Sequence, residues 1–181
     1  MTSLRDLNGT YVIDPTHTTL GFVVRHAMVT KVRGTMTAEG SAVLNGQDPE
    51  SSSITVTADV TSINTQNDGR DEHLRSADFF EVEKFPTMTF TSTSVGLKGD
   101  DEVEVTGDLT IRDTTRQVTL PMEFGGAATD PYGQERVGFS GGTTINRTDF
   151  GLTWNAALEA GGVLVSDKVQ LELEVSLVKQ A

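Results

Sequence analysis

The sequence predicts an all-β protein that folds as one extended, eight-stranded antiparallel up-and-down barrel. Apolar and polar residues alternate over runs longer than the usual strand of about five or six residues. Short clusters of turn-forming residues separate these runs, which favours antiparallel neighbours. Only one stretch has helical signals, so we expect one short helix packed against an end of the barrel. A sandwich of the immunoglobulin type, which has shorter strands and Greek-key crossovers, is the second alternative.

Composition narrows the classes of function. The 181 residues show no compositional break, so we expect a single domain over 1–181. The formal net charge of −12 predicts repulsion of nucleic acid and of anionic lipid surfaces, and we expect no nucleic-acid partner. Cysteine is absent and no secretion signal is recognisable, which together favour the cytoplasm. No apolar run reaches 18 residues, so no membrane-spanning helix is expected.

The first third of the chain predicts strands that alternate cleanly. Residues 1–9 read as a loose lead-in, and Pro15 divides the next region into a short strand from Tyr11 and a longer one. Two further strands are expected over 30–44 and 53–63. Alternation places one set of side chains of the longer strand on a common inward face: Leu20, Phe22, Val24, His26 and Met28.

The stretch from Thr65 to Pro86 contains the predicted helix of about ten residues. Asn67 and Asp68 can cap its first turn, and Pro86 prevents its continuation. His73, Ala77 and Phe80 would form its apolar stripe. Such a short helix needs a partner surface, so we expect three side chains to close one end of the barrel and two to anchor the segment by polar contacts. The closing residues are Leu74, Phe79 and Phe80, and the anchoring residues are Arg70 and Asp71.

Strands are predicted again over 87–97, 103–112, 118–124, 137–145 and 168–177, with a Gly-rich excursion over 149–165 that contains Trp154, the only tryptophan. Flexible Met, flat Phe and small residues occupy the alternate positions of these strands whose side chains are expected to point inward. Two interpretations remain open: an ordinary packed core, or an elongated apolar cavity in which small residues leave room for a ligand.

Signals of catalysis are weak. His17, His26 and His73 lie far apart in the sequence, and neither a metal-binding motif nor a nucleophile elbow accompanies them. No nucleotide-binding glycine pattern is present. We therefore expect no catalytic residue, no metal and no cofactor.

Several stretches, in this order, resemble the YceI-like family of polyisoprenoid-binding, lipocalin-like proteins: IDPTHTTLGFVVRHAM, VTSINTQNDGRDEHLRSADFFEVEKFPTMTFTSTSV, VTGDLTIRDTTRQVTL, NRTDFGLTWN and SDKVQLELEV. The resemblance implies a lipocalin-like barrel that carries a long apolar chain, such as a polyprenyl compound or an isoprenoid quinone. It implies no catalytic residues. Tyr11 and Asp113 depart from residues that are frequent in the family, and neither belongs to the expected lining.

The resulting hypothesis is non-enzymatic binding, transport or storage of a long-chain apolar lipid, and a homodimer is compatible with it. One alternative is an enzyme that acts on such a lipid with His26 or His17 as acid or base. Another is a ligand-free interaction module. The predicted ligand-binding residues are Leu20, Phe22, Val24, His26, Met28, Met36, Ala58, Phe90, Phe124, Phe139 and Trp154.

Overall fold

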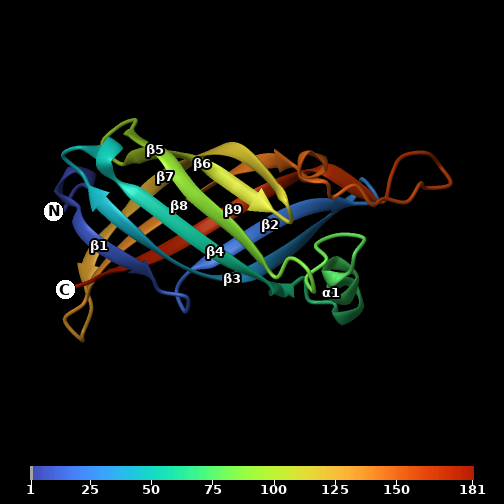
Figure 1. Cartoon of the computed structure of the whole chain (residues 1–181), viewed down its shortest axis with the longest axis horizontal. Coiled ribbons are helices and arrows are strands. Elements are labelled where there is room, and N and C mark those ends of the chain that lie inside the picture. Colours follow the sequence, from blue (N-terminus) through green and yellow to red (C-terminus); the bar gives the residue numbers. More distant parts are fainter. Residues whose placement is uncertain (1) are drawn as a thin grey trace.

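The computed structural model describes residues 2–181, and in this range the protein is an elongated β-barrel with one short α-helix at an end (Figure 1). The strands are β1 (Asn8–Ile13), β2 (Thr19–His26), β3 (Thr30–Asn45), β4 (Ser53–Asn64), β5 (Thr87–Leu97), β6 (Glu102–Ile111), β7 (Thr114–Thr129), β8 (Glu135–Asn146) and β9 (Val165–Lys179). The helical segments are η1 (Leu4–Asp6), η2 (Pro49–Ser51), α1 (Asp68–Arg75) and η3 (Arg147–Phe150).

The predicted fold class is confirmed. Strands β2 to β9 pair antiparallel with their sequence neighbours, and pairing of β2 with β9 closes the eight-stranded barrel. Strand β1 is additional: it pairs with β3 through residues 41–45 and with β9 through residues 177–179. Strand β2 pairs with the other parts of the same two strands. The break at Pro15 therefore lets β1 and β2 lie end to end between β3 and β9.

Two sequence-based expectations were wrong in detail. Within the described part, residues 2–9 are not a loose lead-in, because Leu4, the first residue of η1, and Leu7, which directly follows η1, are both buried. Their spacing of three residues places both side chains on one side of a 3₁₀ turn. The apolar stripe of the helix also ends early. The amide and hydroxyl of Ser76 both donate to the carbonyl of His73, at 3.1 and 2.6 Å, so the helix stops at Arg75 and Ala77 is exposed.

The anchoring of α1 follows the expectation. Asn67 caps the helix by accepting a hydrogen bond from the amide of Arg70 at 2.9 Å. The Arg70 guanidinium donates to the hydroxyl and carbonyl of Thr65 at 2.7 and 2.6 Å. The buried Asp71 carboxylate accepts from the Thr65 amide at 2.9 Å. These bonds hold α1 against the end of β4.

The two ends of the barrel differ (Figure 1). Both termini, η1 and η2 lie at one end, whereas α1 lies at the other with the β2–β3 turn and the segment that follows η3. We call these the terminal end and the helix end. Within residues 2–181, no helix is long and apolar enough to cross a membrane.

Candidate functional site

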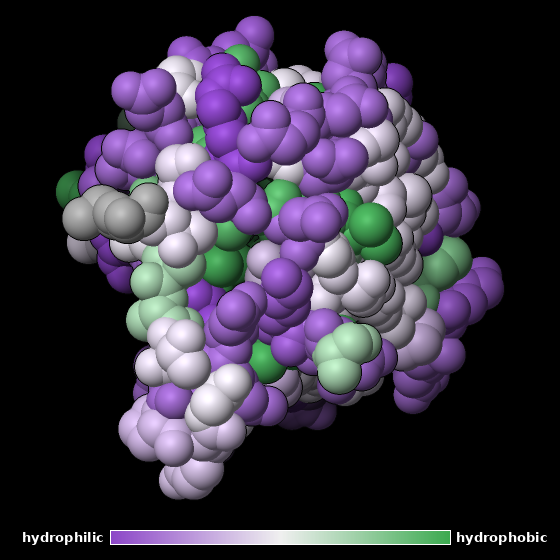
Figure 2. All heavy atoms as spheres, turned by 90° about the vertical axis from the view of Figure 1, so that its left-hand side faces the viewer, coloured by the Kyte–Doolittle hydropathy of each residue, from purple (hydrophilic) through white to green (hydrophobic). Residues whose placement is uncertain are grey.

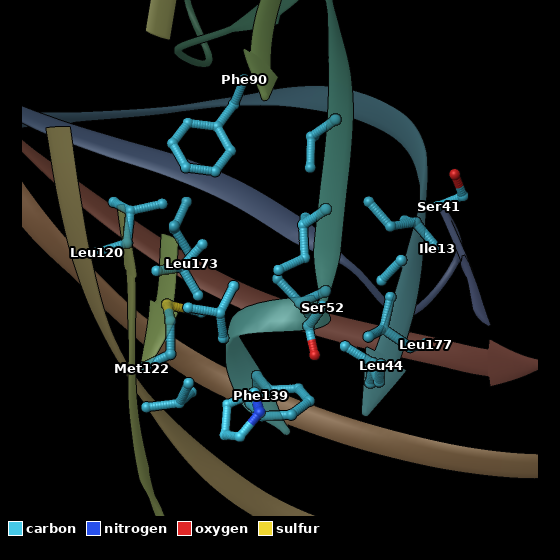
Figure 3. A pocket seen from close by; sticks show the side chains of 18 of the residues that line it. Ile13, Ser41, Leu44, Ser52, Phe90, Leu120, Met122, Phe139, Leu173 and Leu177 are labelled. Atoms are coloured by element: carbon cyan, nitrogen blue, oxygen red, sulfur yellow. The ribbon is translucent and has the colours of Figure 1, made fainter. Parts of the chain in front are cut away.

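The interior of the barrel holds a cavity of about 220 Å³. Side chains from all nine strands border it, and Figure 3 shows Phe90, Leu120, Phe139 and Leu173 approaching it from different strands. The lining includes no charged residue, and its polar members are Ser41, Asn45, Ser52 and Thr89. The site is therefore suited to an apolar molecule.

The cavity reaches the terminal end. Leu4 of η1, Leu7 directly after it and Pro49 of η2 border it there, together with the polar residues Asn45 and Ser52. The Ser52 hydroxyl accepts a hydrogen bond from the Asn45 amide at 2.9 Å. Figure 2 views this end and shows apolar residues within a hollow that polar residues surround. This end can admit the apolar part of a ligand and leave a polar group near the rim.

The cavity stops before the helix end. Met36, Val60 and Ile63 form a buried cluster there, and Leu74 and Phe80 pack against it. The expected closure of this end by Leu74 and Phe80 is thus present. Ala58 belongs both to the cluster and to the cavity lining, so it lies at the floor of the cavity.

Four of the sequence-predicted ligand residues border the cavity: Leu20, Ala58, Phe90 and Phe139. Two others are buried beside it. Met36 belongs to the cluster near the helix, and Phe124 packs near the terminal end with its ring centroid 5.5 Å from that of Phe139.

Phe22 and Val24 are half-buried beyond the floor of the cavity. The Phe22 ring covers Gly34 of the neighbouring strand, so closely that a Cβ atom added to Gly34 would lie 2.2 Å from the ring. The glycine thus makes room for the protein's own aromatic ring. Parity correctly predicted the inward direction of this ring, but the cavity ends before reaching it.

The expected inward positions of His26 and Met28 were wrong. His26 is exposed at the end of β2, and Met28 is 60% exposed in the β2–β3 turn. The alternation stops because Ala27 and Met28 have positive φ angles of 51° and 64°, which turn the chain. Trp154 also lies outside the cavity, half-buried at the helix end against His73 and Phe79.

The three histidines lie apart from one another and from the cavity. The His17 side chain is 67% exposed and its Nδ1 lies 2.7 Å from Asp14 Oδ2, while His73 Nε2 lies 2.9 Å from Asp78 Oδ2. Neither residue, nor His26, borders the cavity. Among residues 2–181, no group of three or more His, Cys, Asp or Glu side chains could hold a metal ion.

Sequence reasoning underestimated the aliphatic part of the lining. The candidate set emphasised Met and Phe, whereas most of the lining is Val, Leu and Ile. The alternation of apolar and polar residues in β9 could have predicted part of this lining, since four of its inward residues border the cavity: Leu171, Leu173, Val175 and Leu177. The contribution of Leu4, Leu7 and Pro49 had only a weak signal, because isolated apolar residues in short connecting segments show no periodicity.

Comparison with known proteins identifies the relatives of this barrel. Residues 11–177 match the YceI-like domain. A UPF0312 protein of Staphylococcus aureus is 39% identical over 165 residues, which cover 90% of this chain and 93% of that protein. A UPF0312 protein of Staphylococcus epidermidis is 39% identical over 162 residues, covering 88% and 91% of the two chains.

Solved structures share the architecture. The YceI protein of Campylobacter jejuni is 29% identical with a TM-score of 0.73, and the match covers 87% of this chain and 90% of that one. BcnA of Burkholderia cenocepacia is 21% identical with a TM-score of 0.77, over 91% and 98% of the chains. A polyisoprenoid-binding domain from Saccharophagus degradans is 16% identical with a TM-score of 0.73, over 94% and 98%. The last two likenesses concern the fold alone.

Proposed function

The chain belongs to the YceI-like family, and on this premise we propose that it binds a long-chain apolar lipid inside its barrel. The observation that carries the proposal is the cavity of about 220 Å³ without a charged residue in its lining. Predominantly apolar walls favour a hydrocarbon chain, because burial removes its surface from water.

The apolar walls also favour an occupied cavity. A bound hydrocarbon chain makes van der Waals contacts with side chains that have no such partner across the open space.

The ligand class we propose is a polyisoprenoid or an isoprenoid quinone. The Saccharophagus degradans domain with the same fold is described as polyisoprenoid binding, which supports this choice. A cavity of about 150 Å³ already accepts a benzene-sized molecule, so a longer chain needs additional room. Met88 and Met122 border the cavity, and their unbranched side chains can adopt other rotamers to provide it.

The arrangement of the cavity gives the ligand a direction. The apolar chain would lie toward Ala58, and the polar group would lie at the terminal end near Ser52 and Asn45. His17 and His26 are remote from the lining, so the role we propose is binding, transport or storage of an unaltered lipid.

The test is organic extraction of the purified protein followed by mass spectrometry, with the lipid quantified per mole of protein. We expect one class of apolar-chain lipid in near-stoichiometric amount. Delipidated protein should also take up decylubiquinone or farnesol in equilibrium dialysis and return it with unchanged mass. Failure to retain any lipid, combined with failure to take up either probe, would refute the proposal. Conversion of a probe would contradict the non-enzymatic role.

A further inference from the structure

The β2–β3 turn exposes two large apolar side chains at the helix end. Met28 is 60% exposed and Val29 is 74% exposed. The side chains project from the tip of a hairpin and therefore cannot be explained as part of the barrel's core. Exposed apolar side chains that form a contiguous patch mark protein–protein or membrane interaction sites.

The backbone of this turn is unusual for its sequence. The Val29 amide donates to the His26 carbonyl at 3.1 Å, and the two residues between them both have positive φ. Turns of this kind favour Asn-Gly, because positive φ is unfavourable for residues with larger side chains. The chain places Ala27 and Met28 there instead. The turn therefore gives up local stability while it presents an apolar side chain.

A second hairpin extends the apolar tip. Ala157 and Val163 pair across it, and Val163 is 39% exposed. The sulfur of Met28 lies against Gly162, where an added Cβ atom would be 2.3 Å from it. In Figure 1 this loop extends beyond the β2–β3 turn at the helix end. We call Met28, Val29, Val163 and the residues between the paired positions the apolar tip.

Positive charge borders the apolar tip. Residues 25–33 contain Arg25, Lys31 and Arg33 and no acidic residue, in a chain with a net charge of −12. Arg33 is paired with Glu172 at 2.7 Å, whereas Arg25 and Lys31 are exposed. Two acidic residues lie close by: Glu159 is exposed within the apolar tip itself, and Asp167 lies 3.6 Å from the buried Arg147.

The overall negative charge repels an anionic surface less strongly at the apolar tip than the net charge alone predicts. Strand β3 has 16 residues and spans about 50 Å at roughly 3.3 Å per residue. Charges at the terminal end are therefore several Debye lengths, of about 10 Å each, from the apolar tip. The helix end also carries acidic residues, among them the exposed Asp68 and Glu72 of α1, so the basic residues of the hairpin act on an anionic surface that approaches at the apolar tip.

We propose that the apolar tip docks on a lipid bilayer that contains anionic lipids, with Met28 and Val29 in the interfacial region and Arg25 and Lys31 near the phosphates. Apolar insertion and basic residues act together in interfacial binding. A second protein copy fits the tip less well. A stable interface buries about 1,200 Å² or more, and a convex tip with three exposed apolar side chains offers far less.

This docking is independent of the proposed lipid function but is compatible with it. Leu20 borders the cavity, and the next inward residues of β2 toward the tip are the half-buried Phe22 and Val24. These three side chains form an apolar strip that leads from the cavity to the docked end.

Vesicle cosedimentation tests the proposal. The full chain is mixed with vesicles of phosphatidylcholine and phosphatidylglycerol at 3:1, and with pure phosphatidylcholine. We expect stronger binding to the anionic vesicles, weakened by salt. The pair Met28→Asn and Val29→Thr should reduce binding on the order of tenfold, through lost apolar insertion. Asn tolerates positive φ, so this pair should still fold.

Matched variants away from the apolar tip show whether a loss of vesicle binding is specific to the tip. Val43→Thr alters a residue that is 47% exposed near the terminal end and should leave binding unchanged. Arg25→Glu and Lys31→Glu should each weaken binding by at least about fivefold, whereas Lys98→Glu on the β5–β6 turn should not. Equal binding to both vesicle types, or equal losses for the Val29 and Val43 variants, would overturn the proposal. A dimer in light scattering that the tip variants dissociate would instead assign the tip to a second copy.

Discussion

The indole of Trp154 meets the imidazole of His73 edge to face, with their ring centroids 4.6 Å apart. Phe79 completes the group at 5.1 Å from His73 and 5.4 Å from Trp154. The three rings join the segment after η3 to α1, two parts of the chain that are distant in sequence. Closure of the helix end therefore depends on both segments, and aromatic pairs of this kind contribute about 0.5–1.5 kcal/mol beyond their burial.

Phe79→Ala should lower the free energy of unfolding by about 3–5 kcal/mol, because the ring is buried and its loss leaves a cavity. Denaturant unfolding measures this value. Phe80 is only half-buried, so Phe80→Ala should cost less than the range expected for a fully buried ring. Tyr132→Ala, at a ring that is 89% exposed, is the control and should stay within about 0.5 kcal/mol. A Phe79 loss as small as the control would show that the aromatic group does not close this end.

Arg147→Lys tests how the segment after η3 is held. The buried Arg147 guanidinium donates to the carbonyls of Leu152, Trp154 and Ser166 at 2.7, 2.9 and 2.9 Å. Burial lowers the pKa of Arg147 from its ordinary value, and Asp167 partly offsets this shift. Lysine cannot reproduce the planar donor set.

We expect Arg147→Lys to lose about 1.5–3 kcal/mol of stability and to shift Trp154 fluorescence toward the emission of exposed indole. Arg116→Lys is the matched control, because Arg116 is exposed and donates to the Asp149 carbonyl at 3.2 Å. Identical unfolding curves for the two variants would argue against a special role of Arg147.

Acid should weaken the terminal end through Asp14. Hydrogen bonds from Thr16, His17 and Arg136 hold the pKa of the Asp14 carboxyl well below its ordinary value. Arg136 donates to Asp14 at 2.6 Å and to Asp130 at 2.8 Å, so it links the end of β1 to the β7–β8 turn. A depressed pKa contributes stability above the unfolded-state value of about 3.9, and this contribution is lost as pH falls below it.

Asp14→Asn should therefore be less stable than the parent at pH 7, and the difference should shrink as pH decreases from about 4 toward 2. Thermal unfolding of both proteins across this range measures it. A stability difference that stays constant over the whole range would mean that the Asp14 charge is not involved.

The sequence predicted the barrel because apolar and polar residues alternate along each strand. Each strand keeps this alternation when the sheet closes into a barrel. In β9, every inward residue from Leu171 to Leu177 could be assigned by parity alone. Parity failed where the chain turned. It placed His26 and Met28 inside, although the positive φ angles at Ala27 and Met28 end the strand there. Non-glycine residues seldom adopt this conformation, so the residue types at these two positions do not indicate a turn.

Parity also could not predict where the cavity ends. Phe22 and Phe90 both face inward, yet only Phe90 borders the cavity. Each ring lies over a glycine of the neighbouring strand, Phe22 over Gly34 and Phe90 over Gly107, so the glycines do not distinguish the two positions. Volumes left by side chains on different strands are not encoded in any single stretch of sequence.

The most direct test of the proposed function is the amount of lipid that co-purifies with Ala58→Phe. Ala58 is buried at the floor of the cavity, so a phenyl ring there would occupy ligand space. Thr55→Phe on the same strand is the matched control, because Thr55 is exposed. Lipid per mole of protein is measured after organic extraction, and unfolding of the delipidated proteins is followed in parallel.

If the cavity holds a lipid, Ala58→Phe should retain its stability and lose its lipid, while Thr55→Phe keeps the parental amount. In a packed interior the same ring would overpack the core and cost roughly 1–3 kcal/mol. A destabilised Ala58→Phe variant, together with no lipid in the parent, would contradict lipid binding and indicate a solid-cored barrel.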